Sequence, residues 1–403
     1  MKSTKLFCSF GALAMTLGLV AAGVPPATPG VRLTADTTAL VMGGTSLPTP
    51  TPWYMDMARN QFIAPTHPGL DIDYVPVTTP EEHGPLTGID RLILTVFASP
   101  KLVNGAWSGV PLWKLSGLFD RNADQSVHDG VTDLEQAIAE HAGSPQVIFG
   151  YSQGAAVAVA EKRKLAQKYP VGTPAPAIDF VLLGDPSVPN GGLNSRFPGL
   201  HTYFLLGTFT KAEPTDTQFK TTVVSRQYDM ATDFPLYPLN LVADLNAVMG
   251  FLYLHTHYND VSLAGSASSG AQVQTHGDST YYFFPTKHLP LFDPLRSIGV
   301  PEALIDLVEP TFRAIVEAGY DRSIPLWKPT AARLFPPLNF GKKAATPAPI
   351  AGSPVAAAAT GKTTKQSTAP VKPLAAAASP AAGHSKPPKA ADHAAKPPKG
   401  THT

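Results

Sequence analysis

The chain has 403 residues with a formal charge of +1, 43% hydrophobic residues, one cysteine and 42 prolines. A nearly neutral chain lacks the cationic surface of a nucleic-acid binder, and a single cysteine excludes both a disulfide scaffold and a cysteine-based zinc site. The proline content, roughly twice the usual share, indicates that part of the chain is not globular.

The first thirty residues are typical of an export signal. Lys2 and Lys5 precede an uncharged, mostly apolar run over residues 6–24, and small residues stand at its end. This order defines a secretory signal, but a run of this length also nearly spans a bilayer. We therefore predict that residues 1–30 are a signal peptide or an N-terminal membrane anchor. The protein is accordingly expected to be secreted or held in the cell envelope.

Residues 31–343 are predicted to form one folded domain in which short apolar runs alternate with helical segments. Unbroken apolar runs suit strands that are covered on both faces, as in a parallel sheet. Helices are predicted at residues 127–141 and 153–169. The alternation predicts an open α/β sheet with helices on both faces. The expected strands lie at residues 38–42, 91–97, 146–149, 178–183, 201–206 and 221–224.

The C-terminal third of this domain follows a different pattern. Helices are predicted at residues 239–253 and 301–319, and these either cover the strand ends as a lid or pack as ordinary helices of the domain. Residues 344–403 contain seven lysines, one acidic residue and no aromatic residue. Such a segment cannot bury enough apolar surface to fold, so we predict a disordered tail. Its lysines also suggest an arm that contacts anionic envelope polymers.

The strongest local signal is the sequence Gly150-Tyr-Ser-Gln-Gly154, which lies between a predicted strand and a predicted helix. In a nucleophile elbow, a tight strand-to-helix turn presents a serine above the sheet, and flanking glycines are needed where strand and helix cross. Because the strand, turn and helix occur in the required order, Ser152 is predicted to be a catalytic nucleophile. A purely structural turn is the alternative.

Acyl transfer by a serine also requires donors for the oxyanion. The amide of Gln153 follows the nucleophile directly and is one expected donor. The second is expected from the loop after an early strand, where Thr45 or Ser46 would offer an amide or a hydroxyl. In the alternative interpretation, the preceding Gly43-Gly44 pair only turns the chain.

A serine nucleophile further needs a base and an acid that orients the base, which follow it in this fold class in the order acid, then histidine. Asp185, Asp229 and Asp233 all lie near predicted strand ends. His255 and His257 end an apolar helix and would point toward these strand ends. The two histidines also resemble a metal pair, but no third ligand is evident, so we predict no metal and no cofactor.

Four motifs in order carry a family resemblance. They are Gly-Gly-Thr-Ser-Leu-Pro, Gly-Tyr-Ser-Gln-Gly, Tyr-Asp-Met-Ala-Thr-Asp-Phe-Pro and Tyr-Leu-His-Thr-His-Tyr. With them the chain resembles the PE-PPE-domain serine hydrolases of the mycobacterial type, over roughly residues 40–336. That family is similar to cutinases, which implies a cutinase-like α/β-hydrolase fold. The chain carries an apparent export signal where many members have a PE or PPE helical module. In this it resembles members that act as acyltransferases on trehalose glycolipids.

The resemblance implies a triad of Ser152, Asp229 and His255. His257 and Asp233 stand in the same two motifs and remain alternatives for the base and the acid. The predicted function is an exported serine esterase, or an acyltransferase acting on cell-envelope glycolipids of the trehalose type. Its partners would be an acyl ester or glycolipid substrate and the membrane or cell wall, without nucleic acid. The alternative is a non-catalytic envelope protein that binds lipid or polysaccharide on a hydrolase fold.

Overall fold

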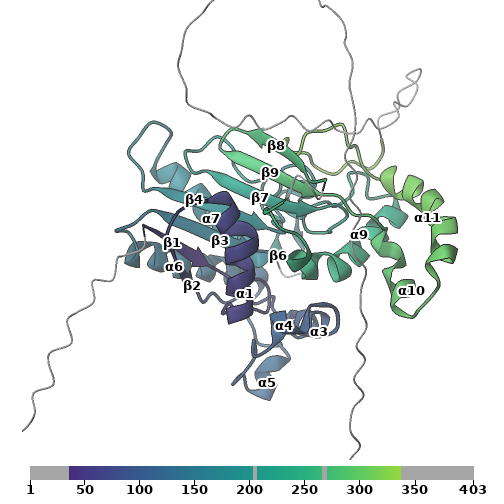
Figure 1. Ribbon diagram of the computed structural model, residues 1–403, viewed down its shortest axis with the longest axis horizontal. Helices are drawn as coiled ribbons and strands as arrows, with labels where there is room; N and C mark the ends of the chain where they lie inside the picture. Colours follow the sequence, from purple (N-terminus) through teal and green to yellow (C-terminus); the bar gives the residue numbers. More distant parts are fainter. Residues whose placement is uncertain (1–35, 203–206, 266–269, 337–403) are drawn as a thin grey trace, which may run out of the picture. The chain divides into compact units, whose positions relative to one another are not determined.

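A seven-stranded sheet forms the centre of the protein, whose computed structural model describes residues 36–202, 207–265 and 270–336 (Figure 1). The spatial order of the strands is β2-β1-β3-β4-β7-β9-β8, and every neighbouring pair is parallel except β8 with β9. The strands are β1 (Thr37–Val41), β2 (Ile72–Pro76), β3 (Gln146–Tyr151), β4 (Ile178–Leu183), β7 (Thr221–Arg226), β8 (Gln272–His276) and β9 (Ser279–Phe284). The open parallel sheet predicted from the sequence is confirmed.

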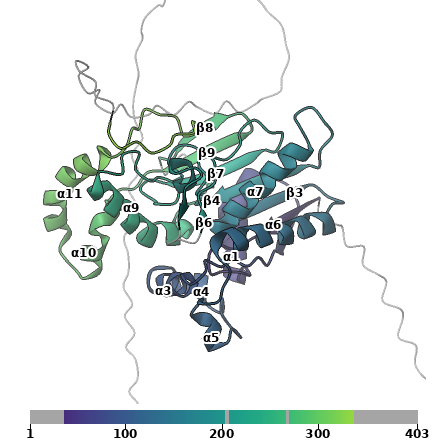
Figure 2. The same ribbon diagram turned by 180° about the vertical axis from the view of Figure 1, so that it is seen from behind.

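Helices cover both faces of this sheet. Helices α6 (Ala123–Glu140) and α7 (Gln153–Lys168) lie side by side on one face (Figure 2). The other face is covered by α1 (Pro52–Met57), a π-helical turn (Ala58–Ile63) and α2 (Ala64–Thr66).

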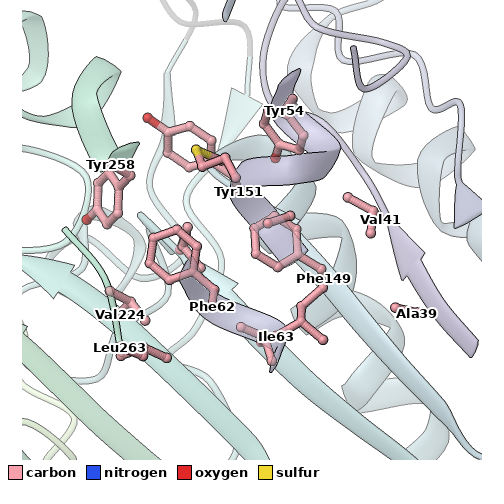
Figure 3. Packing of buried hydrophobic residues seen from close by; sticks show 14 of the residues in the cluster. Ala39, Val41, Tyr54, Phe62, Ile63, Phe149, Tyr151, Val224, Tyr258 and Leu263 are labelled. Carbon is pink, nitrogen blue, oxygen red and sulfur yellow. The ribbon is translucent and has the colours of Figure 1, made fainter. Parts of the chain in front are cut away.

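Strand β3 is fully buried between these two layers. Successive side chains of a strand point to opposite faces. Ile148 accordingly joins the core under α6 and α7, whereas Phe149 packs with Tyr54 and Phe62 in the opposite core (Figure 3). The continuous apolar run therefore reports burial on both faces, as the sequence predicted.

The prediction of a strand at residues 91–97 is wrong. These residues belong to helix α3 (Thr87–Phe97), which is followed by the short helices α4 (Pro100–Val103) and α5 (Leu112–Leu115). The helix keeps apolar residues on its outer side, where Leu92 is 62% exposed. Three of its exposed apolar residues, Ile89, Leu92 and Val96, are spaced three and four residues apart, which is the period of a helix. The unbroken apolar run over residues 91–97 is also of strand length, and this favoured the wrong interpretation.

Of the predicted strand at residues 201–206, His201–Thr202 forms β5, which pairs antiparallel with β6 (Gly207–Thr208) in a two-stranded ribbon separate from the main sheet. Residues 203–206 lie outside the described residues. Helix α8 (Leu193–Arg196) precedes this ribbon. The sequence analysis assigned no strand to β2, β8 or β9, which complete the sheet at its two edges.

The C-terminal helices form a small core of their own. Helix α9 (Leu241–Tyr253) runs into a 3-10 segment (His255–Asp260), and α10 (Asp293–Ser297) follows a 3-10 turn (Pro290–Phe292). Helix α11 (Glu302–Glu317) packs on α9 through residues such as Ala243 and Val316. The helices predicted at residues 239–253 and 301–319 are thus confirmed.

The two chain ends predicted as an export signal or anchor and as a disordered tail, residues 1–30 and 344–403, lie outside the described residues. Within the described part of the chain, no helix combines the length and the apolar character needed to cross a membrane. The proposed division of the chain into signal, domain and tail stays a prediction.

Candidate active site

Ser152 occupies the turn between the end of β3 and the start of α7. Its φ of 57° is in the left-handed region, which is strained for any residue with a side chain. The turn is possible because the residues two positions before and after the serine are glycines. A Cβ on Gly150 would lie 2.3 Å from the carbonyl oxygen of Gly154, and one on Gly154 would lie 2.2 Å from that of Gly43. The sequence thus builds the strained strand-to-helix turn expected of a nucleophile elbow.

Three residues far apart in the sequence form a hydrogen-bonded chain at this turn. The Nε2 atom of His255 lies 2.8 Å from Ser152 Oγ, and its Nδ1 atom lies 2.9 Å from Asp229 Oδ2. Asp229 follows β7 and His255 begins the 3-10 segment after α9. The structure therefore brings together the serine, the aspartate and the histidine in the chain order expected of an α/β-hydrolase.

The carboxylate of Asp229 is completely buried, and its hydrogen bonds fix its orientation. Oδ1 accepts the amide of Ala231 at 2.9 Å, and Oδ2 accepts the hydroxyl of Tyr258 at 2.8 Å in addition to His255. Burial, and then the charge of Asp229, raise the pKa of Tyr258 well above its ordinary value. Tyr258 therefore stays protonated and serves as a permanent donor to this carboxylate.

The imidazole of His255 is held on several sides. The ring of Phe251 stacks on it with centroids 4.8 Å apart and planes at 16°, and the ring of Tyr151 contacts it at 5.5 Å. Below it lies Gly184, which has a φ of +58° and where a Cβ would come within 2.8 Å of the imidazole Cε1. These contacts fix the ring with Nδ1 toward Asp229 and Nε2 toward the serine.

The alternative residues for the acid and the base lie in other hydrogen-bond networks. Asp233 pairs with Arg322 at 2.7 Å and accepts the amide of Tyr228 at 2.8 Å. The Nδ1 atom of His257 lies 2.9 Å from its neighbour Thr256 Oγ1, and burial lowers the pKa of His257. In the described part of the chain, neither side chain contacts Ser152.

The third aspartate considered, Asp185, is completely buried and accepts the amide of Ser187 at 2.8 Å. Burial is the main cause that raises the pKa of Asp185 to about 8, with the nearby charge of Glu213 adding to it. A carboxyl that is neutral at pH 7 cannot act as the anionic partner of an imidazole.

Gln153 offers its backbone amide beside the nucleophile. It is the first residue of α7, and the first amides of a helix have no acceptor within the helix. Its side chain is fixed by two hydrogen bonds, with Ser126 Oγ at 3.1 Å and with the carbonyl oxygen of Glu82 at 3.0 Å. The amide of Gln153 is therefore available for an oxyanion on a well-anchored residue.

The two other oxyanion candidates differ in their surroundings. Ser46 donates its amide to the Glu81 carbonyl at 2.7 Å and its hydroxyl to the Thr87 carbonyl at 3.3 Å, so both groups are occupied. Thr45 lines the pocket beside Ser152, and its amide has no hydrogen-bond partner among the described residues. Thr45 is thus the better placed of the two. The Ser46 carbonyl accepts the indole Nε1–H of Trp107 at 2.8 Å, which links this turn to the segment after α4.

Ser152 and His255 open into a pocket of about 720 Å³ with a mainly apolar wall. Most of its lining residues come from two groups of elements. One group comprises α6, α7 and the residues of and after β6; the other comprises His83, α3, α4, the turn at residues 44–47 and the end of α9. The second group contributes one polar pair, in which His83 Nδ1 lies 2.9 Å from Asp90 Oδ2.

One group of side chains in the described residues has the spacing of metal ligands, namely His288, Glu302 and Asp306. It is half-exposed at the start of α11, and Glu302 already pairs with Arg296 at 3.1 Å. None of its members lines the pocket that contains Ser152. The cluster therefore adds nothing to the chemistry of the serine.

The sequence analysis did not single out three features of this site: Tyr258, the anchored side chain of Gln153, and the pair formed by His83 and Asp90. Tyr258 had a signal, since it follows His255 by three residues and so lies on the same side of a helical turn. The anchoring of Gln153 depends on residues far apart in the sequence, whereas His83 and Asp90 are only seven residues apart and are brought together by the start of α3.

Comparison with known proteins gives a consistent family. Residues 75–321 match the PE-PPE domain. The chain is 40% identical over 305 residues to "Esterase PE16" of Mycobacterium tuberculosis, a match that covers 74% of this chain and 51% of that protein. It is 30% identical over 210 residues to "Diacyltrehalose acyltransferase Chp2" of the same organism, covering 49% of this chain and 57% of the relative. A third relative, "SL1278 acyltransferase Chp1", is 30% identical over 260 residues, with 61% and 63% covered. The chain thus spans about half the length of several of these relatives.

Proposed function

This chain belongs to the PE-PPE domain family, and from that premise we propose that it is a serine enzyme that acts on acyl esters through an acyl-enzyme. Ser152 is the proposed nucleophile, His255 the base and Asp229 the acid that orients it. The observation that carries the proposal is the hydrogen-bonded chain from Asp229 through His255 to Ser152, which ends at a largely apolar pocket.

In the proposed first half-reaction, Ser152 Oγ attacks the acyl carbon while His255 Nε2 accepts the hydroxyl proton. The carbonyl oxygen becomes an oxyanion, for which the amides of Gln153 and Thr45 are the proposed donors. When the C–O bond to the alcohol breaks, His255 returns the proton to the leaving oxygen. The acyl group then remains on Ser152 as an ester.

In the second half-reaction, His255 removes a proton from an incoming hydroxyl, which attacks the acyl-enzyme and releases Ser152. Throughout, Asp229 keeps the proton on Nδ1 of His255 and stabilises the imidazolium. Water as the attacking group makes the enzyme an esterase, and a sugar hydroxyl makes it an acyltransferase. We propose a glycolipid of the trehalose type as the acyl acceptor, which is supported by the name of one relative, the diacyltrehalose acyltransferase.

We further propose that the enzyme works in the cell envelope, outside the cytoplasm. This location is supported by the basic and apolar pattern of residues 1–30 and by the name of the diacyltrehalose acyltransferase relative.

A fluorophosphonate probe tests the nucleophile directly. The wild-type protein should be labelled covalently, and Ser152→Ala should not be labelled although it keeps the wild-type melting temperature. Labelling of the Ser152→Ala variant at another residue would show that this other residue is the nucleophile. Absence of label on a folded wild type would instead favour a non-catalytic protein that binds lipid or polysaccharide.

The acceptor is tested by supplying a p-nitrophenyl ester with and without trehalose. An acyltransferase should produce acylated sugar, detected by mass spectrometry, at the expense of free fatty acid. Release of free acid alone at every sugar concentration would restrict the proposal to an esterase.

A further inference from the structure

One branch of the pocket follows the seam between α6 and α7 away from the serine. On α7 the pocket is lined by Ala156 and Ala160, which are four residues apart and therefore lie on the same side of the helix. On α6 the apolar lining residues are Val127 and Val131, also four residues apart, and Asp124, His128 and Thr132 line the pocket as well. The two helices are neighbours (Figure 2), and each contributes a short apolar row to the pocket lining.

The alanines are on the pocket side of α7 and not on its sheet side. Ala155 and Ala158 are completely buried against the sheet, whereas Ala156 and Ala160 are only partly buried. Because Ala156 and Ala160 have small side chains, space remains between α6 and α7. A larger side chain at either position would fill that space.

A third element covers the seam and is attached to both helices. The amide and hydroxyl of Thr208 in β6 both bind Asp124 of α6 at 2.8 Å. At the other end, Arg163 of α7 donates to the carbonyl of Ala212 at 3.0 Å and also to that of Lys211. This branch of the pocket is therefore bounded by α6, α7 and the residues of and after β6, and hydrogen bonds hold these three elements together.

The polar groups around this branch already have partners. Asp124 is bound to Thr208, and Thr210 accepts from the side chain of Asn194 at 2.9 Å. When the polar groups of a site are already hydrogen-bonded within the protein, a ligand without polar groups leaves none of them unpaired. The apolar wall of the site then favours methylene groups. The branch is therefore suited to a hydrocarbon chain.

The branch ends at two cations, Arg163 and Lys164, which also line the pocket. Ala160 lies eight residues beyond Ser152, which corresponds to about 12 Å along the helix axis. A hydrocarbon chain that continued past Ala160 would meet charged groups, whose desolvation is unfavourable. The apolar part of the branch thus has a defined length.

We propose that this seam between α6 and α7 is the acyl-chain subsite and that Ala156 and Ala160 set the length of the acyl chain the enzyme prefers. The inference rests on the proposed acyl-enzyme at Ser152. The acyl group would extend from Ser152 Oγ along α7, with its first methylenes over Ala156 and later ones over Ala160. The branch beside α3, with its pair of His83 and Asp90, is then left for the alcohol part of the substrate.

The test compares kcat/KM for p-nitrophenyl butyrate, octanoate, dodecanoate and palmitate in three single variants of the full chain. In Ala160→Leu, the dodecanoate-to-butyrate ratio should fall at least about tenfold, the loss expected when about two methylenes can no longer be buried. In Ala156→Leu, the decline should already be present in the octanoate-to-butyrate ratio, because this position is closer to the serine.

The matched control is Ala166→Leu, on the same helix but outside the pocket lining. Leucine is nearly as favourable as alanine in a helix, so all three variants should fold. The control should keep the wild-type ratios for every ester. A complementary variant, Lys164→Met, replaces the charged end by an apolar group and should raise the palmitate-to-octanoate ratio.

Unchanged ratios in both pocket variants, with an active wild type, would overturn the acyl subsite but leave the serine chemistry intact. An equal fall in Ala166→Leu would also overturn it, since the effect would then come from the helix and not from the seam. A folded wild type without activity toward any of the esters would contradict the proposed function itself.

Discussion

Two networks of buried polar side chains lie next to the sheet, and they differ in whether they reach the pocket. One runs from Tyr258 and Asp229 through His255 to Ser152, which lines the pocket. The other surrounds Lys162, whose ammonium group lies 2.9 Å from Glu213, 3.0 Å from Asp278 and 2.8 Å from the Pro214 carbonyl. The side chains of Lys162 and Glu213 are completely inaccessible to solvent.

The Lys162 network stabilises the fold, whereas the Ser152 network has the arrangement needed for a reaction. The Lys162 network is closed, because each of the ammonium group's partners belongs to the protein. The Ser152 network is open, since the serine hydroxyl meets a cavity large enough for a ligand. Both incur the cost of desolvating polar groups, but only the open one can exchange a proton with a substrate.

The largest expected effect comes from breaking the open network at its buried end. Asp229→Asn should lower kcat toward a soluble ester by about ten-thousandfold, because the asparagine amide favours the wrong imidazole tautomer. The matched variant Asp233→Asn, four residues away, should lose stability through Arg322 but keep its turnover per folded molecule. Stopped assays combined with thermal melts would measure both. A kcat that falls more in Asp233→Asn would reassign the orienting acid.

The closed network should respond with a loss of stability only. Lys162→Met leaves Glu213 and Asp278 buried without their cation, and we expect the free energy of unfolding to fall by about 3–5 kcal/mol. Chemical denaturation measures this change, and labelling by the fluorophosphonate probe at low temperature should remain. A folded Lys162→Met protein that is stable but no longer labelled would show that the two networks are coupled.

A smaller effect is expected from Tyr258, which donates to the carboxylate of the open network and whose ring lies edge-on to the imidazole of His255. Tyr258→Phe removes one hydrogen bond to a charged group, which corresponds to about 1.5–3 kcal/mol and hence at least about tenfold in kcat. A kcat equal to that of the wild type would limit Tyr258 to packing.

The smallest effect on turnover is expected at Asp185, whose pKa burial raises from 3.8 to about 8. Between these pH values the unfolded chain ionises this carboxyl while the native protein keeps it protonated, so its contribution lowers stability as the pH rises. Asp185→Asn removes the titration. Its melting temperature relative to the wild type should therefore be higher at pH 8 than at pH 5, whereas kcat stays unchanged. A difference that is constant with pH would contradict the raised pKa.

The sheet was predictable where burial alone decides the pattern. Strands β1, β3, β4 and β7 are continuous apolar runs followed by turns, and each is a strand in the structure. Helix α3 was predicted wrongly because the apolar run over residues 91–97 is unbroken and of strand length, although Ile89, Leu92 and Val96 follow the helical period. The edge strands were missed because they are partly exposed and their pairing depends on distant segments.

For the site, the serine was predictable because strand, glycine turn and helix are adjacent in the sequence. The choice between Asp229 and Asp233, or between His255 and His257, was not decidable from spacing. Each pair occupies one short segment, and only the fold directs one member toward Ser152 and the other toward partners such as Arg322. The anchoring of Gln153 by Ser126 and Glu82 likewise joins segments that the sequence leaves unrelated.

The bond from the Trp107 indole to the Ser46 carbonyl ties two parts of the wall together. The residue before Ser46 is Thr45, the proposed second oxyanion donor, and Trp107 belongs to the stretch between α4 and α5. If that stretch moved outward, the hydrogen bond from the indole would be lost, and the turn that carries Thr45 would be held less firmly. A change at Trp107 would thus act on the proposed oxyanion donor, although 61 residues separate the two bonded residues.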